Sequence, residues 1–427
     1  MKILSRGIRL TDYKDLSLST TQLKRAPIPA QVSIPLKQHE GIPALPIVKA
    51  GDKVLVGAKI AVAQGDFSAN LHSSISGIIQ AIHEEFIQID SDGKDEWDLA
   101  VREEKHWKET PGEEILNAIF DAGIVGFGKQ AFPTHLKIAG VREAFQNSGS
   151  GILILNGCES DAFLTSDYIL MINHPLEILY GAEFLLRASG AKKCVIAIEN
   201  NKLDAIEILL SKIRGHGFNQ MEVKALPTRY PQGSERELVR CVLGGSVQSR
   251  ISLVHSVATA FAVCEAVRFH KPLVERVVTI TGHCVVEPKN LICRIGTPVS
   301  DLIKACKGFL RDPGKVIFGG PMSGSSVTNL DTPITKATNG IVALAPEFIN
   351  RGEESPCIRC GFCVEVCPEE LNPEMLIRAV RHQAKSIVRE FDIQSCIECG
   401  NCTFVCPSKI PMADILREGK QLVADEV

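Results

Sequence analysis

The sequence predicts a multidomain chain of α/β and β modules that ends in a small, cysteine-rich α domain. Its length of 427 residues fits about three domains of ordinary size. Short apolar strands alternate with amphipathic helices in the middle of the chain, which is typical of a layered α/β domain. Eight of the fifteen cysteines lie between Cys357 and Cys406.

Composition and charge exclude several classes of protein. The chain has 47 Lys and Arg against 50 Asp and Glu, a net charge of −3, so nucleic acid is not an expected partner. A hydrophobic content of 45% supports folded cores. The first residues lack the apolar stretch of a secretory signal, and no run approaches the roughly 18 apolar residues of a membrane-spanning helix. We therefore expect a cytosolic chain with reduced thiols and no transmembrane helix.

Two cysteine runs, beginning at Cys357 and Cys396, share the spacing C-x2-C-x2-C-x3-C-P. This spacing is typical of two-cluster ferredoxins, in which the fourth cysteine of each run ligates the other cluster. Zinc, the alternative, prefers two C-x2-C pairs per site and does not explain two runs that each end in Cys-Pro. We therefore predict two [4Fe–4S] clusters. The predicted ligands are Cys357, Cys360, Cys363 and Cys406 for cluster I, and Cys367, Cys396, Cys399 and Cys402 for cluster II.

The cysteine-rich domain is predicted to span 345–420. The segment 373–389 between the two runs has helical periodicity and is predicted to form one helix. The other seven cysteines are scattered in apolar stretches, where cysteine commonly packs as a small hydrophobic residue.

Residues 28–105 predict a barrel-sandwich β-module, because strand and turn signals alternate in 47–57 and 74–82. Carriers of lipoyl or biotinyl groups share this pattern and need a lysine at a hairpin tip. The span 60–93 contains no lysine, so a swinging-arm role is rejected and a structural role is expected.

Residues 110–250 predict an α/β domain, with strands at 151–156 and 194–199 and helices at 175–189 and 203–214. A glycine-rich loop at 126–134 precedes a helix, and such a loop can hold phosphate through its backbone N–H groups. Residues 251–335 predict a mixed β-module. It contains a strand at 277–282, a short helix at 299–306 and a tight turn at 319–324.

Several runs, in one order along essentially the whole chain, resemble the C subunit of the Rnf/Rsx electron-transport complex. They are PLKQH at 35–39, AFPT at 131–134, IENNK at 198–202, YPQG at 230–233, KPLVER at 271–276, GGPM at 319–322 and the two cysteine runs.

The resemblance implies a fold and a function for each module. The α/β domain is expected to be Rossmann-like and flavin-bearing, as in the flavin subunit of respiratory complex I. The module 251–335 is expected to be a β-grasp module of the SLBB-like type, and 345–420 to be ferredoxin-like. The family's C subunit is peripheral, on the cytoplasmic face of the inner membrane. It contacts the other subunits of a translocase that couples electron transfer between NADH and ferredoxin to ion movement.

The resemblance also carries over a candidate flavin and nicotinamide site. The family motif GLGGAGFPT reads GFGKQAFPT at 126–134, NxAECEPY reads NGCESDAF at 156–163, and QNVGT reads HSVAT at 255–259. No catalytic residue is assigned. The candidate cofactor-binding residues are Gly126, Gly128, Lys129, Asn156, Glu159, Asp161 and Ser256.

These three motifs depart from the family pattern, whereas the cysteine runs match it at every ligand position. We therefore hypothesise that binding of FMN or NADH is altered or lost while electron relay is kept. Two interpretations stay open: an NADH-oxidising, FMN-containing input subunit, or a non-flavin relay or docking subunit with a degenerate pocket. A third, a soluble reductase accessory protein, would lack membrane partners. NADH dehydrogenase activity of the chain itself is left open.

Overall fold

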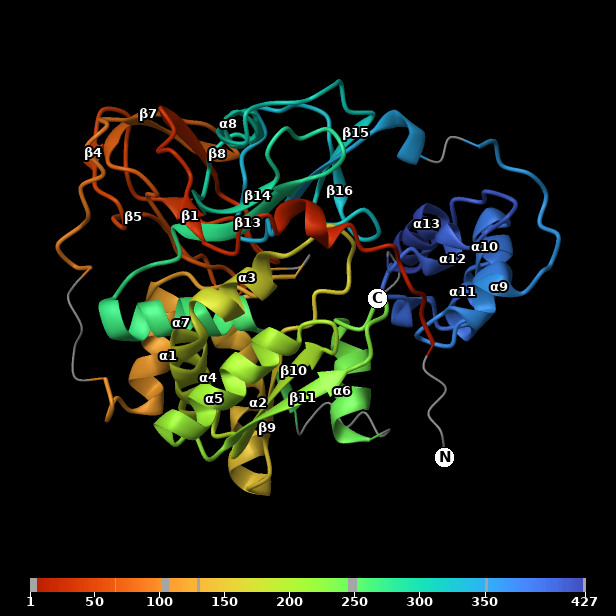
Figure 1. Cartoon of the computed structure of the whole chain (residues 1–427), viewed down its shortest axis with the longest axis horizontal. Helices are drawn as coiled ribbons and strands as arrows, with labels where there is room; N and C mark the ends of the chain where they lie inside the picture. The colour runs from red at the N-terminus through yellow and green to blue at the C-terminus, as the bar shows by residue number, and fades with distance from the viewer. Residues whose placement is uncertain are drawn as a thin grey trace.

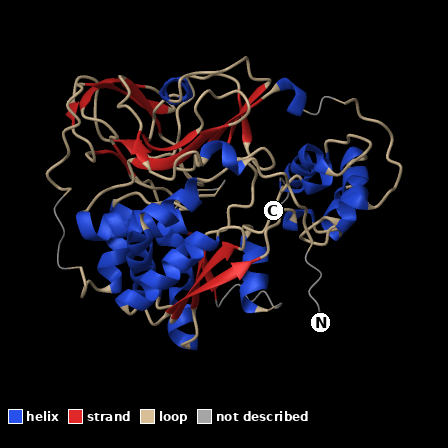
Figure 2. Cartoon of the chain, in the orientation of Figure 1, coloured by secondary structure: helices blue, strands red, loops and turns tan. Residues whose placement is uncertain are grey.

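The computed structural model describes residues 6–65, 67–101, 107–128, 131–244, 252–349 and 352–424. Figure 1 shows two β-rich modules above an α/β domain, with the cysteine-rich domain to one side. Figure 2 shows the same division, with most strands in the upper layer and most helices in the lower one. The mixed α/β and β character expected from the sequence is confirmed.

The N-terminal β-module consists of two sheets with strand orders β2-β8-β7-β4 and β3-β5-β6. Side chains alternate in burial along β8, where Ile87 and Ile89 are buried, as expected for a strand with one face on a core. The strands are β2 (Gln31–Pro35), β3 (Leu45–Pro46), β4 (Lys53–Val54), β5 (Lys59–Val62), β6 (Leu71–His72), β7 (Gly77–Ile82) and β8 (Phe86–Ser91).

The α/β domain is built on a parallel sheet of order β11-β10-β9-β12. β10 is an apolar strand buried along nearly its whole length, which is typical of a parallel sheet covered on both faces. The elements are α1 (Gly112–Asp121), α2 (Thr134–Ser148), β9 (Ile152–Asn156), α3 (Ser166–Asn173), α4 (Pro175–Ser189), β10 (Lys193–Glu199), α5 (Leu203–His216), β11 (Met221–Leu226), α6 (Glu235–Leu243), β12 (Ser252–Ser256) and α7 (Val257–Phe269).

The position of β12 corrects the expected boundary between 110–250 and 251–335. β12 pairs with β9 in the parallel sheet, and α7 follows it directly, so both belong with the α/β domain. The sequence does not predict this placement. Along the chain β12 follows β11, but in the sheet it pairs with β9 on the side away from β10 and β11. The other expected domain boundaries stay predictions.

The third module is a six-stranded sheet of order β1-β14-β13-β17-β15-β16. Its edge strand β1 comes from the N-terminal segment, which also forms the short helix η1. The expected turn at 319–324 is present, with the N–H of Gly324 donating to the carbonyl of Gly320 at 2.8 Å. The elements are η1 (Lys14–Ser17), β1 (Lys24–Arg25), β13 (Glu275–Thr281), β14 (Lys289–Arg294), α8 (Val299–Ala305), β15 (Lys315–Phe318), β16 (Ser325–Val327), β17 (Gly340–Leu344) and η3 (Pro346–Phe348).

The cysteine-rich domain is helical, and its central segment is two helices where one was predicted. The break follows α10 at 382–384, where Gln383 takes a left-handed backbone conformation with φ 53°. The elements are α9 (Phe362–Glu365), α10 (Pro373–Arg381), α11 (Lys385–Glu390), η4 (Ile393–Ser395), α12 (Asn401–Phe404) and α13 (Met412–Ala424).

One hydrophobic core joins the N-terminal β-module to the α/β domain and includes Ile60, Ile89, Ile115 and Leu155. The third module and the cysteine-rich domain each have a core of their own. Across the described ranges, no single helix combines the length and apolarity needed to cross a membrane. The pair α3 and α4, bent by 97°, passes that test only when taken together.

Candidate functional site

The carboxyl ends of β9 and β12 border a cavity of about 970 Å³, here called the switch-point cavity. The strand order reverses between these two strands, and ligands of open α/β sheets bind at such a point. Ligand pockets commonly hold about 300–1,000 Å³, so this one suits a large cofactor. The candidate residues that line it are Gly128, Asn156, Glu159, Asp161 and Ser256. Gly126 is not part of the wall, and Lys129 lies outside the described residues.

The glycine-rich loop reaches the cavity at Gly128. The N–H of Gly126 donates to the carbonyl of Phe132 at 2.8 Å, and the N–H of Ala131 donates to that of Gly128 at 3.0 Å. These bonds fold the loop back just before α2. A Cβ built on Gly128 would meet no atom within 4 Å, so this part of the wall is open. Ala131 stands where the family motif has glycine and adopts a left-handed conformation, φ 46°, with its methyl group buried.

Asn156 and Ser256 are neighbours across the sheet, at the last residues of β9 and β12. Asn156 donates from its amide to the carbonyl of Gly233 and accepts from the N–H of Cys158, both at 3.0 Å. Ser256 accepts from the N–H of Thr259 at 3.0 Å and so caps α7. The N-terminus of α7 therefore borders the cavity, and helix N-termini favour phosphate groups.

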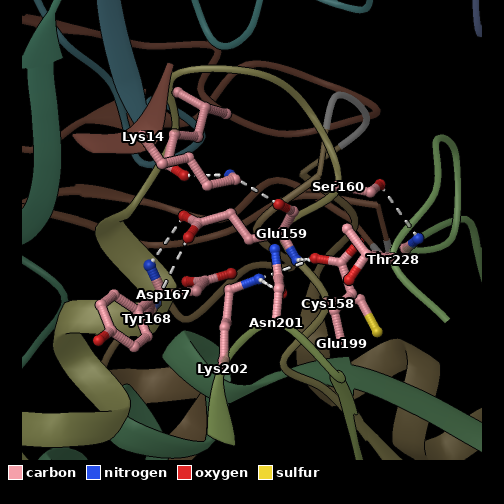
Figure 3. Close-up of polar contacts among 12 residues, drawn as sticks. Lys14, Cys158, Glu159, Ser160, Asp167, Tyr168, Glu199, Asn201, Lys202 and Thr228 are labelled. Atoms are coloured by element: carbon pink, nitrogen blue, oxygen red, sulfur yellow. Dashed lines mark hydrogen bonds and ion pairs between the residues drawn. The ribbon is translucent and has the colours of Figure 1, made fainter. Parts of the chain in front are cut away.

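Glu159 organises the turn after β9. Its carboxylate accepts from the hydroxyl of Ser166 at 3.1 Å. It also accepts from the N–H of Asp167 at 3.0 Å, at the start of α3 (Figure 3). Its own N–H donates to Glu199 at 3.1 Å, and Glu199 is paired with Lys202 at 2.8 Å in a fully buried contact. The Glu159 carboxylate is thus held by α3, with only 5% of the residue exposed.

The buried amine of Lys14 holds the same turn from the N-terminal segment. It donates to the carbonyls of Glu159, Asp161 and Leu164 at 2.8, 3.0 and 2.5 Å. Burial lowers the pKa of Lys14. No local pattern in the sequence predicts these contacts, because Lys14 lies about 145 residues from its partners.

Asp161 links the α/β domain to the third module. It accepts from the hydroxyl of Ser323 at 2.9 Å and from the N–H groups of Met322 and Ser323 at 3.4 and 3.3 Å. A Cβ on Gly320 would lie 2.1 Å from the Asp161 side chain, so only glycine fits there. This carboxylate, a candidate ligand group, is therefore engaged by the turn at 319–324.

Each predicted cysteine quartet surrounds a cavity of its own. All four predicted ligands of cluster I line one cavity, and all four of cluster II line another. In each case the fourth cysteine, Cys406 or Cys367, comes from the opposite run, which supports the crossed assignment. Within the described ranges, no three His, Cys, Asp or Glu side chains converge as ligands of a single metal ion do. The four cysteines of each quartet instead line a common cavity, the arrangement expected of residues that share a four-iron cluster.

Burial raises the pKa of Cys399 and of Cys402 to about 12. Because the thiolate is the form that binds iron, a cluster held by these two thiols would displace their protons.

The cavity lined by the predicted ligands of cluster II lies next to the switch-point cavity. Cys399 lines both the cluster II cavity and the switch-point cavity. Tyr230, also in the wall, donates from its hydroxyl to the carbonyl of Cys399 at 2.9 Å. A cofactor held at the ends of β9 and β12 would therefore share a wall with Cys399, one of the predicted ligands of cluster II.

Three further residues of the cavity wall, Phe127, Asp167 and Tyr230, were not among the candidates. Loss of solvation, together with the neighbouring Glu159, raises the pKa of Asp167 to about 7. The guanidinium of Arg276 lies 3.6 Å from the centre of the Phe127 ring and packs against the glycine-rich loop there. Phe127 and Tyr230 lie in the runs GFG and YPQG, which could have marked them as site residues. Asp167 lies in no such motif.

Comparison with known protein families gives four matches. Residues 2–96 match the RnfC barrel sandwich hybrid domain, and 119–267 match the Nuo51 FMN-binding domain. Residues 277–325 match the SLBB domain, and 353–410 match the 4Fe-4S dicluster domain. These matches and the site define an iron–sulfur protein with an FMN-binding type of domain.

Three similar relatives are the C subunits of translocating oxidoreductase complexes. The C subunit of the proton-translocating ferredoxin:NAD(+) oxidoreductase complex of Clostridium ljungdahlii is 38% identical, over 88% of this chain and 84% of its own. The C subunit of the ion-translocating oxidoreductase complex of Rhodobacter capsulatus is 38% identical, over 86% and 73%. That of the Na(+)-translocating complex of Acetobacterium woodii is 35% identical, over 84% of each. The chain belongs to the family of C subunits of ion-translocating oxidoreductase complexes, as the sequence predicted.

Among solved structures, an NAD+-reducing [NiFe]-hydrogenase in the H2-reduced state has a similar fold. The TM-score is 0.52 at 18% sequence identity, and the match covers 76% of this chain and 65% of the hydrogenase chain. At this identity the likeness concerns the fold alone.

Proposed function

We propose that this chain transfers electrons between NADH and the iron–sulfur carriers of a membrane-bound, ion-translocating complex. One observation carries the proposal. The cavity lined by Gly128, Asn156 and Ser256 is lined also by Cys399, a predicted ligand of cluster II. A flavin site and the first cluster of a relay are therefore adjacent within one chain.

The residues present fit FMN. The cavity volume of about 970 Å³ accommodates it, the open backbone at Gly128 allows close approach, and the capped N-terminus of α7 at Ser256 suits its phosphate. When bound, FMN supplies the conversion between two-electron exchange with nicotinamide and one-electron exchange with clusters. Asn156 and Glu159 hold the turns around the cavity, and Tyr230 ties its wall to cluster II.

We also propose a fold type for each module and a location for the chain. The two small sheets of the first module suit a barrel sandwich, and the parallel sheet suits a Rossmann-like domain. The mixed six-stranded sheet suits a β-grasp module, and the two helical halves suit a ferredoxin-like domain. We place the chain peripherally, on the cytoplasmic face of the inner membrane, in contact with the other subunits. Ferredoxin would exchange electrons with it through the complex.

A second candidate is a relay or docking subunit without flavin. Ala131 favours it, because a buried methyl group in a left-handed conformation replaces a glycine of the family's flavin loop. The variant Ala131→Gly restores the family residue. If it raises FMN affinity strongly while iron content stays constant, the natural loop is adapted away from flavin.

Anaerobic reconstitution with iron, sulfide and FMN tests the proposal. We expect about eight irons and one FMN per chain. Eight irons with no retained FMN would establish the relay subunit instead. Recovery of the chain from washed membranes with other subunits separates both from a soluble reductase accessory protein.

A further inference from the structure

The two cysteine runs place residues of opposite charge at equivalent positions. Arg359 in the first run corresponds to Glu398 in the second, and their φ angles are 54° and 52°. Lys409, three residues after Cys406, corresponds to Glu370, three residues after Cys367, with φ angles of 56° and 58°. The N–H groups of Lys409 and Glu370 each donate to the carbonyl of that cysteine at 3.2 Å. The equivalence is therefore one of conformation as well as sequence.

Around cluster II, cations of the same chain lie beside both acidic residues, Glu398 and Glu370. Glu398 is paired with Arg417 at 3.1 Å and with Lys420 at 3.2 Å, both from α13. Glu370 lies 3.9 Å from Arg6 of the N-terminal segment. The acidic side chains near cluster II are thus met by cations of the same chain.

Around cluster I, the corresponding pair is basic and exposed. Within the described residues, no acidic partner is found for Arg359 or Lys409. Ile358 and Phe362, beside these two residues, are 68% and 49% exposed. Asn401 occupies the position in the second run that Phe362 has in the first. It is only 1% exposed, because it contacts Tyr230 of the α/β domain. The surface equivalent to the covered face of cluster II is therefore open, apolar at its centre and basic at its edge.

We propose that the cluster I rim, formed by Ile358, Arg359, Phe362 and Lys409, docks the acidic face of an iron–sulfur protein. The proposal rests on the proposed function, since it requires cluster I. Carboxylates of the partner would pair with Arg359 and Lys409. This chain's own cations pair in the same way with Glu398 and Glu370.

The chemistry of the rim suits exchange of single electrons. Cys357 and Cys360 are exposed, so they would hold an edge of cluster I at the surface, beside the four residues of the rim. Ile358 and Phe362 give the contact an apolar centre. Docking here would allow transfer of one electron from a reduced cluster to an oxidised one, in which no bond forms or breaks and no proton moves.

The test uses a charge reversal that the fold already accepts. The variant Arg359→Glu/Lys409→Glu gives the surroundings of cluster I the residues that the surroundings of cluster II carry, Glu398 and Glu370, in the same backbone conformations. Arg214→Glu reverses an exposed charge on α5, in the α/β domain, and is the control for a charge reversal away from the rim. The probe is an acidic plant-type [2Fe–2S] ferredoxin reduced by light with deazaflavin. The readouts are its electron exchange with the full chain, at low and high ionic strength, and its Kd.

We expect the wild-type exchange rate to fall as salt rises. At low salt the double variant should be slower by about tenfold or more, with weaker binding and no such salt dependence. Arg214→Glu should behave as wild type. Phe362→Asn should raise the Kd while the salt dependence stays.

Equal rates and affinities in wild type and double variant overturn the proposal. So does a double variant that only dissociates a dimer of this chain, because the rim is then a contact between copies. The ferredoxin supplies the electrons, so loss of FMN or NADH binding does not affect the result. A chain without iron overturns both proposals and is recognised by its iron content.

Discussion

The phenol of Tyr230 donates a hydrogen bond to the backbone carbonyl of Cys399 at 2.9 Å. Tyr230 is only 4% exposed, so little water competes for this bond. The contact joins the wall of the switch-point cavity to a predicted ligand of cluster II, across 169 residues of sequence. It is one of the contacts between the cysteine-rich domain and the α/β domain, together with the ion pair of Arg236 with Glu369 and the hydrogen bond from Arg240 to the carbonyl of Pro368.

Removing this bond should loosen the contact between the two domains. Tyr230→Phe loses one neutral hydrogen bond, worth about 1 kcal/mol, and leaves the Cys399 carbonyl without its partner. Hydrogen exchange in 396–404 should become faster by about fivefold. Tyr168→Phe, which removes the bond to Asp204 at 2.6 Å, is the control and should leave this segment unchanged. Equal exchange in Tyr230→Phe and wild type would show that this bond does not hold the domains together.

Single cysteine variants should reveal the crossed ligand sets. Cys406→Ser should lose the same electron paramagnetic resonance signal as Cys357→Ser, because both belong to cluster I. Cys367→Ser should match Cys399→Ser for cluster II. The half-buried Cys241 lies outside both quartets, so Cys241→Ser should keep all the iron. If Cys406→Ser instead matches Cys399→Ser, each run ligates its own cluster.

A large side chain at Gly128 should fill the cavity without disturbing the fold. A Cβ there meets no atom within 4 Å, and the φ of Gly128 lies outside the left-handed region. Gly128→Leu should therefore lower the affinity for FMN at least tenfold, which corresponds to about 1.4 kcal/mol of binding free energy. The iron content should stay unchanged. Gly140→Ala, on the surface of α2, is the control. Normal FMN binding by Gly128→Leu would place the flavin elsewhere.

Lys336 should make stability depend on pH. Its amine is buried and donates to the carbonyls of Asn70 at 2.8 Å and Gly123 at 2.6 Å, and burial lowers its pKa from 10.5 to about 7. Between these values the unfolded chain binds the extra proton, so stability should rise as pH rises from about 7 to 10. The measurement is the melting temperature of the apo chain, in which Lys336→Met should flatten this rise. Lys304→Met, at an exposed lysine of α8, should not. An equal rise in Lys336→Met would exclude Lys336 as its source.

Local patterns predicted much of the fold. The helix at 175–189 was predicted to the residue, because Pro175 begins α4 and Gly190, with φ 80°, ends it. The cysteine spacing also predicted which cysteines line each cavity. Three cysteines of each quartet lie close together in one run, and the pattern of two-cluster ferredoxins assigns the fourth from the other run. By contrast, the break at Gln383 depends on one left-handed residue in an otherwise helical pattern.

Contacts between distant segments were not predictable from sequence. Lys14 and Tyr230 act on residues more than 140 positions away, and no pattern around them indicates the partner. Asp161 carried the charge expected of a ligand-binding residue, yet that charge is engaged by Ser323. The membership of β12 in the parallel sheet was missed because strand order is set by packing rather than by chain order.

The adjacency of the switch-point cavity and cluster II is tested most directly by anaerobic titration of the reconstituted full chain with NADH. We expect the flavin absorbance and then the cluster absorbance to bleach in wild type, and neither to bleach in Gly128→Leu, although dithionite still reduces its clusters. Clusters that bleach equally in wild type and Gly128→Leu, or that NADH does not reduce at all, would contradict a flavin site beside Cys399.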